Sequence, residues 1–124
     1  KVESDEDLFN VNQPKVVVGL SGDAIYFSRS VIPYLRGEKP ENWASKHTYF
    51  KHLGIYGYNK DTLLKLTRLN PGQLEIAESL EQNRWLENGF RIRTAVTKWE
   101  SIGIDTPEDL ENAIAFLKRN DRNN

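Results

Sequence analysis

The sequence predicts an α/β fold, with strands and helices interleaved along one domain of 124 residues. Three observations support this fold class. Two β-branched runs, at 15–20 and 24–28, flank a turn that contains glycine. Segments with recognisable helix caps follow from residue 59 onward, and residues 90–97 alternate apolar and polar side chains. The sequence contains no internal repeat and no low-complexity segment.

Composition excludes several classes of function. The chain carries 17 Lys and Arg against 18 Asp and Glu, a formal charge of −1, so it lacks the basic excess that binds nucleic acid non-specifically. It contains no run of about 18 apolar residues that could span a membrane. The absence of Cys excludes disulfides, thiolate zinc sites and Cys nucleophiles, and it fits a reducing cytoplasm. We therefore expect neither nucleic acid nor a membrane as partner.

The first third of the chain predicts a hairpin between two irregular segments. Residues 1–14 are polar and predict an arm or linker. The runs at 15–20 and 24–28 predict two strands joined around Gly22. Residues 35–51 contain Gly, Pro and many charges, which predicts a long excursion with one turn of helix near Trp43.

The middle of the chain predicts a strand, two helices and another strand. Residues 52–58 are expected to form the third strand, followed by a helix from an Asn59 cap to about residue 69. A second helix is expected over 74–88, with Gly89 as its left-handed C-terminal cap. The alternating residues 90–97 predict the fourth strand.

The last helix has a strong start signal, with Thr106 as N-cap, Pro107 in the first position and acidic residues behind it. Its apolar positions predict one buried helix face; they are Leu110, Ala113, Ile114 and Leu117. We expect a domain over 15–118 and a frayed tail over 119–124. Because the chain opens at Lys1 and contains no Met, we expect it to be a piece of a longer protein.

Residues 52–58 could carry a binding function. In a strand, His52, Tyr56 and Tyr58 point to the same face, and Gly54 between them leaves space. An imidazole and two phenols can bind the hydroxyls and the carboxylate of a sugar acid. The alternative is a strand-end histidine with two half-buried tyrosines that only pack.

Two further sets of polar residues have similar alternatives. Helical spacing places Glu78, Glu81, Gln82 and Trp85 on one stripe, which is either a pocket wall or a solvated face with one apolar residue. Arg29 closes the second strand and could bind a carboxylate or phosphate through its planar fork, or form a surface ion pair.

Asp105 stands immediately before the Thr106 cap. A carboxylate where an extended segment meets a helix is a common position for ligand and metal groups in α/β folds. The alternative is that Asp105 only helps to cap the helix. The sequence shows no Ser-His-Asp triad, no Gly-rich phosphate loop and no His-based metal spacing.

Four segments occur in a characteristic order: YFSRSVIPY at 26–34, KHLGIYGY at 51–58, LE at 74–75 with ESLEQNR at 78–84, and GIDTPEDLE at 103–111. Together they resemble the C-terminal half of the 3-deoxy-manno-octulosonate cytidylyltransferases, the CMP-Kdo synthetases. The resemblance covers nearly all of residues 15–117. It implies part of a three-layer fold like that of nucleotide-diphospho-sugar transferases, with a mixed sheet and flanking helices.

This resemblance also implies an activity. Members of the family convert CTP and 3-deoxy-manno-octulosonate (Kdo) to CMP-Kdo and pyrophosphate with Mg²⁺, in the cytoplasm, for lipopolysaccharide synthesis, and they act as homodimers. The matching positions imply five Kdo-binding residues, which are Arg29, His52, Tyr56, Glu81 and Gln82. Asp105 matches one of two aspartates that hold the catalytic Mg²⁺.

The family's CTP-binding loop and second metal-binding aspartate belong to its N-terminal half, which these 124 residues do not contain. We therefore expect the parent protein to be a cytidylyltransferase and this chain alone to be inactive. The alternative function is a non-catalytic module that binds a sugar acid or serves only in dimerisation.

Overall fold

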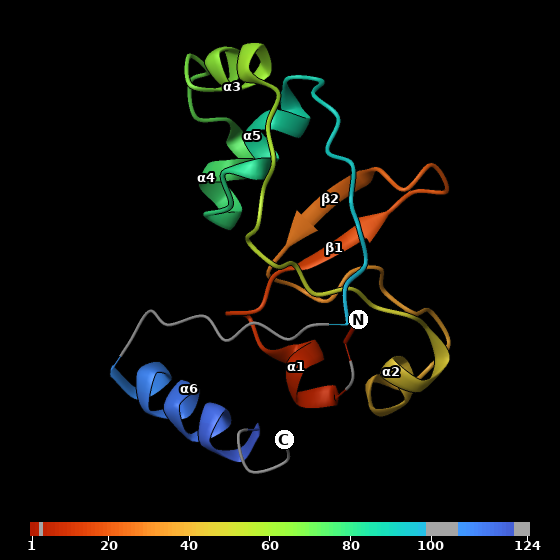
Figure 1. Cartoon of the computed structure of the whole chain (residues 1–124). Coiled ribbons are helices and arrows are strands. Elements are labelled where there is room, and N and C mark those ends of the chain that lie inside the picture. Colours follow the sequence, from red (N-terminus) through yellow and green to blue (C-terminus); the bar gives the residue numbers. More distant parts are fainter. Residues whose placement is uncertain (3, 99–106, 121–124) are drawn as a thin grey trace.

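The computed structural model describes residues 1–2, 4–98 and 107–120. Figure 1 shows a central hairpin with two helical groups on opposite sides. Along the chain the elements are α1 (Asp5–Phe9), β1 (Lys15–Val18), β2 (Ala24–Ser28), a 3₁₀ turn (Pro40–Asn42), α2 (Trp43–Lys46), α3 (Lys60–Leu66), α4 (Gln73–Glu78), α5 (Gln82–Glu87) and α6 (Pro107–Asn120). This content of strands and helices agrees with the predicted α/β class.

The predicted hairpin is confirmed. β1 and β2 pair antiparallel with Val16 opposite Phe27, and the register shifts between Val17 and Val18. Gly22 in the connecting turn has φ +84°, a backbone conformation that residues other than glycine rarely adopt. In the described residues these are the two strands of the sheet, so the pairing seen here is antiparallel rather than mixed.

The predicted third strand over 52–58 is wrong in this extent. This segment runs beside β1 only briefly. The Val16 N–H donates to the Phe50 carbonyl at 3.0 Å, and the backbones of Lys15 and Lys51 form an isolated antiparallel β-bridge. The segment then leaves the sheet edge. A strand requires a continuous row of backbone partners, and local sequence does not reveal whether a partner is present.

The predicted fourth strand over 90–97 has the same outcome. The Ala24 N–H donates to the Ile92 carbonyl at 2.8 Å, and Asp23 forms an isolated bridge with Arg93. These contacts hold the segment around residues 92–93 beside the start of β2, but they do not form a continuous ladder of strand hydrogen bonds.

Two helix caps predicted from sequence are confirmed. The Asn59 side chain accepts hydrogen bonds from the backbone N–H groups of Asp61 (3.0 Å) and Thr62 (3.4 Å), and α3 begins at the next residue. Gly89 has φ +76° and donates its N–H to the Leu86 carbonyl at 3.0 Å, at the end of α5.

The single helix predicted over 74–88 is wrong, because the chain forms two helices, α4 and α5. The break is at Ser79, which has the left-handed values φ 52° and ψ 46°. After this turn Leu80 enters the core and is 6% exposed. Tertiary packing has therefore overridden the uninterrupted helical pattern of the sequence.

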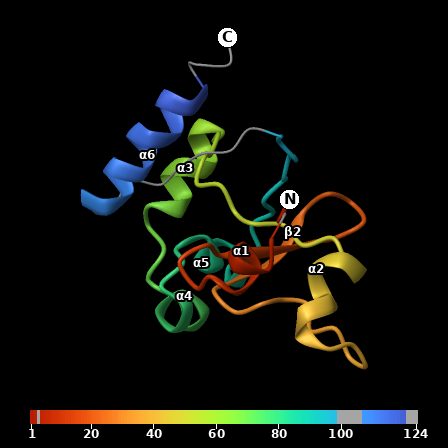
Figure 2. The same cartoon turned by 90° about the horizontal axis from the view of Figure 1, so that it is seen from below.

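The core consists of two clusters. One joins the hairpin to the α4–α5 pair and contains Val16, Ala24, Phe27 and Leu80. The other contains Leu8, Trp43 and Tyr49, and it joins α1 to α2 on the other side of the sheet (Figure 1, Figure 2). The helical turn predicted near Trp43 is thus confirmed as α2.

Residues 1–14 differ from the polar arm that their composition predicts. Residues 5–9 form α1, whose N-cap Ser4 accepts a hydrogen bond from the Asp7 N–H at 3.1 Å. Leu8 is fully buried against side chains more than thirty residues away. Local polarity concealed this contact, because the one residue that anchors the helix lies among charged neighbours.

Helix α6 forms as predicted and lies to one side of the hairpin (Figure 1). Its expected buried face is incomplete, since Ala113 is 8% exposed whereas Leu110 is 48% and Ile114 43% exposed. Asp105 and Thr106 lie outside the described residues, as does most of the predicted tail. Among the described helices, none combines the length and the apolar character needed to cross a bilayer.

Candidate functional site

The centre of the candidate site is a hydrogen bond of 2.7 Å between the Tyr56 hydroxyl and Nε2 of His52. Both side chains are half-buried. Burial lowers the pKa of His52, and burial together with the charges of Tyr58 and Glu81 raises the pKa of Tyr56. Both groups are therefore held neutral, so they can donate and accept hydrogen bonds without carrying charge.

Aromatic rings fix this pair from two sides. His52 meets Phe27 of β2 edge to face, with ring centroids 5.2 Å apart. The buried indole of Trp85 in α5 meets Tyr56 at 5.3 Å and Tyr58 at 5.8 Å, each at an interplanar angle of 82°. The structure thus brings together the three rings that the sequence places on one face, although their segment is not a strand.

The start of α5 contributes two polar groups beside these rings. Gln82 is 4% exposed, and its Nε2 has no hydrogen-bond acceptor among the described residues. Glu81 is exposed; after burial, its charge is the cause that raises the pKa of Tyr58. The Glu81 carboxylate is therefore close enough to Tyr56 and Tyr58 to act on both, and the buried Gln82 amide has an N–H₂ group without an acceptor among the described residues.

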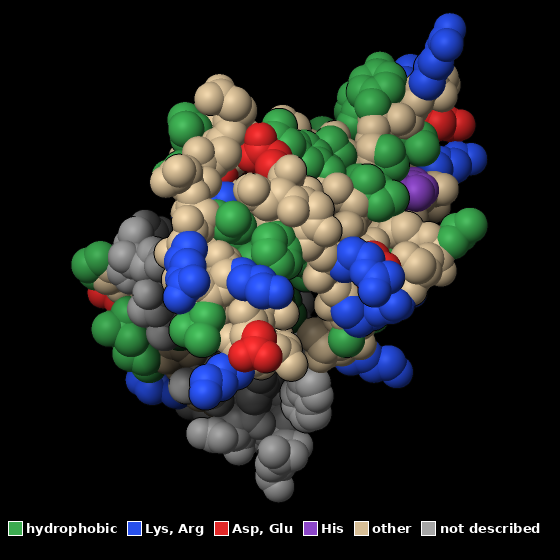
Figure 3. Space-filling view, turned by 90° about the horizontal axis from the view of Figure 1, so that it is seen from above, with side chains coloured by type: hydrophobic (Ala, Val, Ile, Leu, Met, Phe, Trp, Pro, Cys, Tyr) green, Lys and Arg blue, Asp and Glu red, His purple; other side chains and the backbone are tan. Residues whose placement is uncertain are grey.

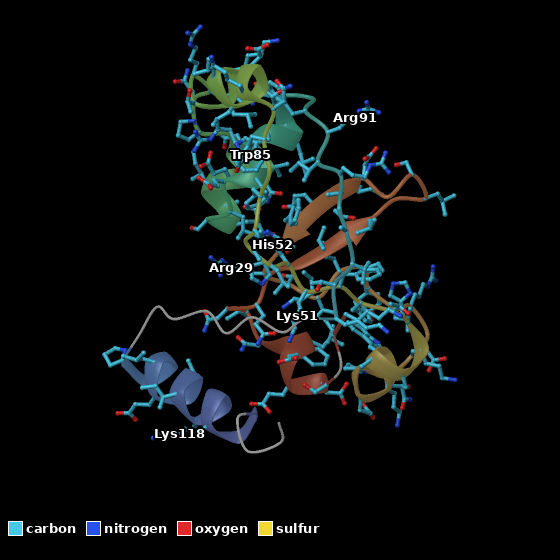
Figure 4. The ribbon with its side chains drawn as sticks, in the orientation of Figure 1. Arg29, Lys51, His52, Trp85, Arg91 and Lys118 are labelled. Carbon is cyan, nitrogen blue, oxygen red and sulfur yellow. The ribbon has the colours of Figure 1, made fainter. Side chains whose placement is uncertain are left out.

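The guanidinium of Arg29 is hydrogen-bonded to the protein itself, unlike that of a free ligand-binding arginine. Its guanidinium donates to backbone carbonyls, from Nε to Glu78 at 2.8 Å, from Nη1 to Val11 at 3.1 Å and from Nη2 to Ser79 at 3.4 Å. Figure 4 shows Arg29 and His52 near the same end of β2, with Trp85 on α5 beyond them. Arg29 is thus near the site while its planar fork is occupied by the protein.

A largely apolar cavity of about 1090 Å³ adjoins the His52–Tyr56 pair. Its walls come from the hairpin, residues 50–56 and residues 92–98, and they include Val16, Val18, Phe27, Ile55, Ile92 and Val96. Of the five predicted Kdo-binding residues, His52 and Tyr56 line this cavity, whereas Arg29, Glu81 and Gln82 lie outside its walls. The predicted residues therefore share one region of the molecule but not one cavity.

Figure 3 shows one face of the molecule, on which the Lys and Arg side chains form separate groups with apolar and polar surface between them. This distribution agrees with the balanced charge of the sequence.

Within the described part of the chain, no three His, Asp or Glu residues come close enough together to hold a metal ion. The predicted metal ligand Asp105 lies outside that part. Its carboxylate offers the oxygen ligands that Mg²⁺ prefers, and Asp105 as a ligand of Mg²⁺ stays a prediction from the sequence.

The role of Asn83 is not apparent from the sequence pattern. This residue is fully buried, and its side-chain amide bonds both backbone groups of Phe27, accepting from N–H at 3.3 Å and donating to the carbonyl at 3.0 Å. The amide thereby satisfies the outer edge of β2 in place of another strand. The one signal in the sequence is the position of Asn83, an amide side chain that directly follows Glu81 and Gln82 within an expected helix.

Comparison with known proteins shows the family of this chain. The family model with the description "Cytidylyltransferase" matches residues 1–120. The chain belongs to the cytidylyltransferase family. Two curated relatives, both named 3-deoxy-manno-octulosonate cytidylyltransferase, come from Parabacteroides distasonis and Cytophaga hutchinsonii. The first is 54% identical over 118 residues, 92% of this chain and 47% of the relative, and the second is 58% identical over 111 residues, 89% and 44%.

A solved structure agrees with this assignment. The chain of a CMP:2-keto-3-deoxy-manno-octonic acid synthetase complexed with CTP matches this cytidylyltransferase chain with a TM-score of 0.82 and 40% sequence identity. The match covers 95% of this chain and 46% of the solved one. The fold is therefore part of a nucleotide-sugar transferase fold, as predicted. This chain spans about half the length of the relatives that it matches.

Proposed function

We propose that this chain is the sugar-acid-binding part of an enzyme that converts CTP and Kdo to CMP-Kdo and pyrophosphate for lipopolysaccharide synthesis. The observation that carries the proposal is the neutral His52–Tyr56 pair, packed against Trp85 of α5, the helix that begins with Gln82, whose buried amide N–H₂ has no acceptor in the described part of the chain. His52, Tyr56 and Gln82 occupy positions that the family resemblance assigns to Kdo binding. The similarity to named Kdo cytidylyltransferases supports the same substrate.

The chemistry of Kdo suits these groups. The sugar acid carries one carboxylate and several hydroxyls, and we propose that His52, Tyr56 and Gln82 bind hydroxyls or the carboxylate by donating hydrogen bonds. The exposed Glu81 carboxylate accepts from sugar hydroxyls. Arg29, already bonded to three carbonyls, contributes its positive charge and any remaining N–H directions. These residues hold and orient the sugar, which lowers the entropic part of the barrier.

The proposed reaction also requires a divalent metal, which we propose is Mg²⁺, with Asp105 as one ligand. The metal would polarise the α-phosphate of CTP and favour deprotonation of the attacking anomeric hydroxyl. We further propose that the whole protein is a cytoplasmic homodimer, as the resemblance implies. The partly exposed Leu110 and Ile114 of α6 are consistent with a partner surface.

Replacing Tyr56 by Phe tests the sugar-acid site. The ring and its packing on Trp85 remain, while the hydroxyl that meets His52 is lost. We expect the transition state with Kdo to be destabilised by about 1–3 kcal/mol, because loss of the hydroxyl leaves a buried polar group without a hydrogen-bond partner. The measurement is the dependence of rate on each substrate in a full-length cytidylyltransferase that carries these residues. His52→Ala should act in the same direction and more strongly, because it removes bulk as well as hydrogen bonding.

Kinetics for CTP provide the internal control, since the resemblance places the CTP-binding loop in the other half of the family's chain. Both variants should leave the apparent affinity for CTP nearly unchanged. Equal losses for CTP and Kdo, or no change for either, would return His52 and Tyr56 to a packing role.

The alternative that the sequence leaves open is a non-catalytic module that binds a sugar acid or serves in dimerisation. We expect the 124 residues alone to release no pyrophosphate from CTP and Kdo in the presence of Mg²⁺, because the family's CTP loop is not among them. The full-length protein is the positive control. Turnover by the 124-residue chain would contradict this expectation.

A further inference from the structure

The carboxylate of Glu78, the last residue of α4, joins this helix to the end of β2. It accepts hydrogen bonds from the Ser28 hydroxyl at 2.6 Å, from the Arg29 backbone N–H at 2.9 Å and from the Tyr26 hydroxyl at 3.3 Å. All three donors lie about fifty residues earlier in the chain. We name this arrangement the Glu78 clamp.

Arg29 holds the same turn from the opposite direction. Its guanidinium donates to the carbonyls of Glu78 and Ser79 at the C-terminal end of α4, where the last carbonyls of a helix have no partner within the helix. A cation at this end of a helix is electrostatically favourable. The side chain of Glu78 therefore bonds the end of β2, and the side chain of Arg29, the residue after β2, bonds the backbone of Glu78 and Ser79.

The turn between these contacts needs to be held. Ser79 adopts a left-handed conformation, which is unfavourable for residues other than glycine and persists where the surroundings enforce it. This turn ends α4, sends Leu80 into the core and starts α5 with Glu81 and Gln82. The direction of the chain at Ser79 thus decides where the two polar groups lie relative to the tyrosines.

We propose that Glu78 is a positioning residue of the sugar-acid site, because its clamp on β2 fixes the Ser79 turn and with it the placement of Glu81 and Gln82. This inference rests on the proposed function for its substrate. Glu78 itself is not placed to bind the sugar, since its two carboxylate oxygens already accept three hydrogen bonds, two from β2 and one from the residue that follows it.

The electrostatics of Glu78 agree with this role. Burial acts to raise its pKa, but the hydrogen bonds from Ser28, the Arg29 N–H and Tyr26 outweigh burial and hold the pKa of Glu78 below its ordinary value. The carboxylate is therefore ionised at neutral pH, where it accepts and does not donate.

Kinetics of Glu78→Gln and Ser28→Ala in the full-length protein test the proposal. For Glu78→Gln we expect kcat/KM for Kdo to fall on the order of 10- to 100-fold, the usual effect of a misplaced binding group, with little change in KM for CTP. Ser28→Ala removes one donor at nearly constant volume, so it should give a smaller loss of the same kind. If the Glu78→Gln protein does not fold, the Kdo kinetics of Ser28→Ala still test the proposal.

Glu75→Gln is the matched control. Glu75 lies on the same helix and is ion-paired with Arg84, and within the described part of the chain it forms no hydrogen bond with β2. This variant should lower thermal stability without a selective effect on Kdo. Equal losses in Kdo kinetics for Glu75→Gln and Glu78→Gln would overturn the positioning role.

A second measurement uses the 124-residue chain and no activity. In ¹⁵N NMR spectra, the side-chain amide signals of Gln82 should shift in Glu78→Gln and Ser28→Ala but not in Glu75→Gln. Unchanged Gln82 signals in both clamp variants would overturn the role of Glu78. If Tyr56→Phe leaves the kinetics of both substrates unchanged, the proposed function fails instead, and shifted Gln82 signals still support Glu78 as the group that positions this residue.

Discussion

Asp105→Asn is expected to reduce metal-dependent turnover of the full-length protein by about 100-fold or more, with almost no change in melting temperature. The proposed role of Asp105 is to hold Mg²⁺ through a charged oxygen, and metal stabilisation of developing charge contributes several kcal/mol to such reactions. Each 1.36 kcal/mol corresponds to about a tenfold change in rate. An amide binds Mg²⁺ more weakly because it carries no negative charge.

Stability should hardly respond, because Asn and Asp are about equally good at helix starts and differ by a few tenths of a kcal/mol. The experiment measures pyrophosphate release as a function of Mg²⁺ concentration, together with thermal unfolding. Asp61→Asn is the matched control, since Asp61 stands in the first turn of α3 and has no proposed ligand. A large fall in melting temperature with preserved turnover would show that Asp105 serves the helix and not the metal.

The features that the sequence predicts correctly are those fixed by neighbouring residues. Asn59 caps α3 through its own side chain, and Gly89 ends α5 because glycine tolerates a positive φ. The hairpin also depends on two adjacent runs and a short turn around Gly22. Each of these signals acts within a few positions, so one sequence is enough to read it.

The features that it misses depend on contacts distant in the chain. Ser79 takes a left-handed conformation where Glu78 accepts hydrogen bonds from the end of β2 and Arg29 donates to the carbonyls of Glu78 and Ser79, and no local sequence pattern predicts this turn. Residues 53–58 have no strand partner among the described residues, and their Tyr56 and Tyr58 rings meet Trp85 instead. The prediction that these rings lie together agrees with the structure, whereas the pleated strand from which it was derived does not form.

The candidate site shows the same division. His52 and Tyr56 are four positions apart, and the structure brings them into hydrogen-bond contact. Glu78 was placed on the same stripe as Glu81, but its carboxylate faces β2. Asn83 was not singled out, because its partner is the backbone of Phe27, to which sequence patterns give no access.

Leu8→Ala provides the largest expected change in stability. Leu8 belongs to α1 and is fully buried in a cluster with Trp43 and Tyr49, in a segment whose composition predicts an unpacked arm. Removing a buried leucine side chain typically costs about 2–5 kcal/mol, from lost transfer energy and the cavity left behind. Domains have only about 5–15 kcal/mol of net stability, so this loss is a large share of the total.

The matched control for this change is Leu20→Ala, the same substitution at the fully exposed tip of the hairpin. Surface changes of this kind usually alter stability by no more than about 0.5 kcal/mol. Chemical denaturation of both variants, followed by the fluorescence of the tryptophans, measures the difference in unfolding free energy. A loss for Leu8→Ala as small as that for Leu20→Ala would mean that residues 5–9 do not pack in solution and that the polar arm is correct. A loss of several kcal/mol confined to Leu8→Ala would show that α1 is part of the folded core, because only a buried side chain leaves a cavity when it is shortened.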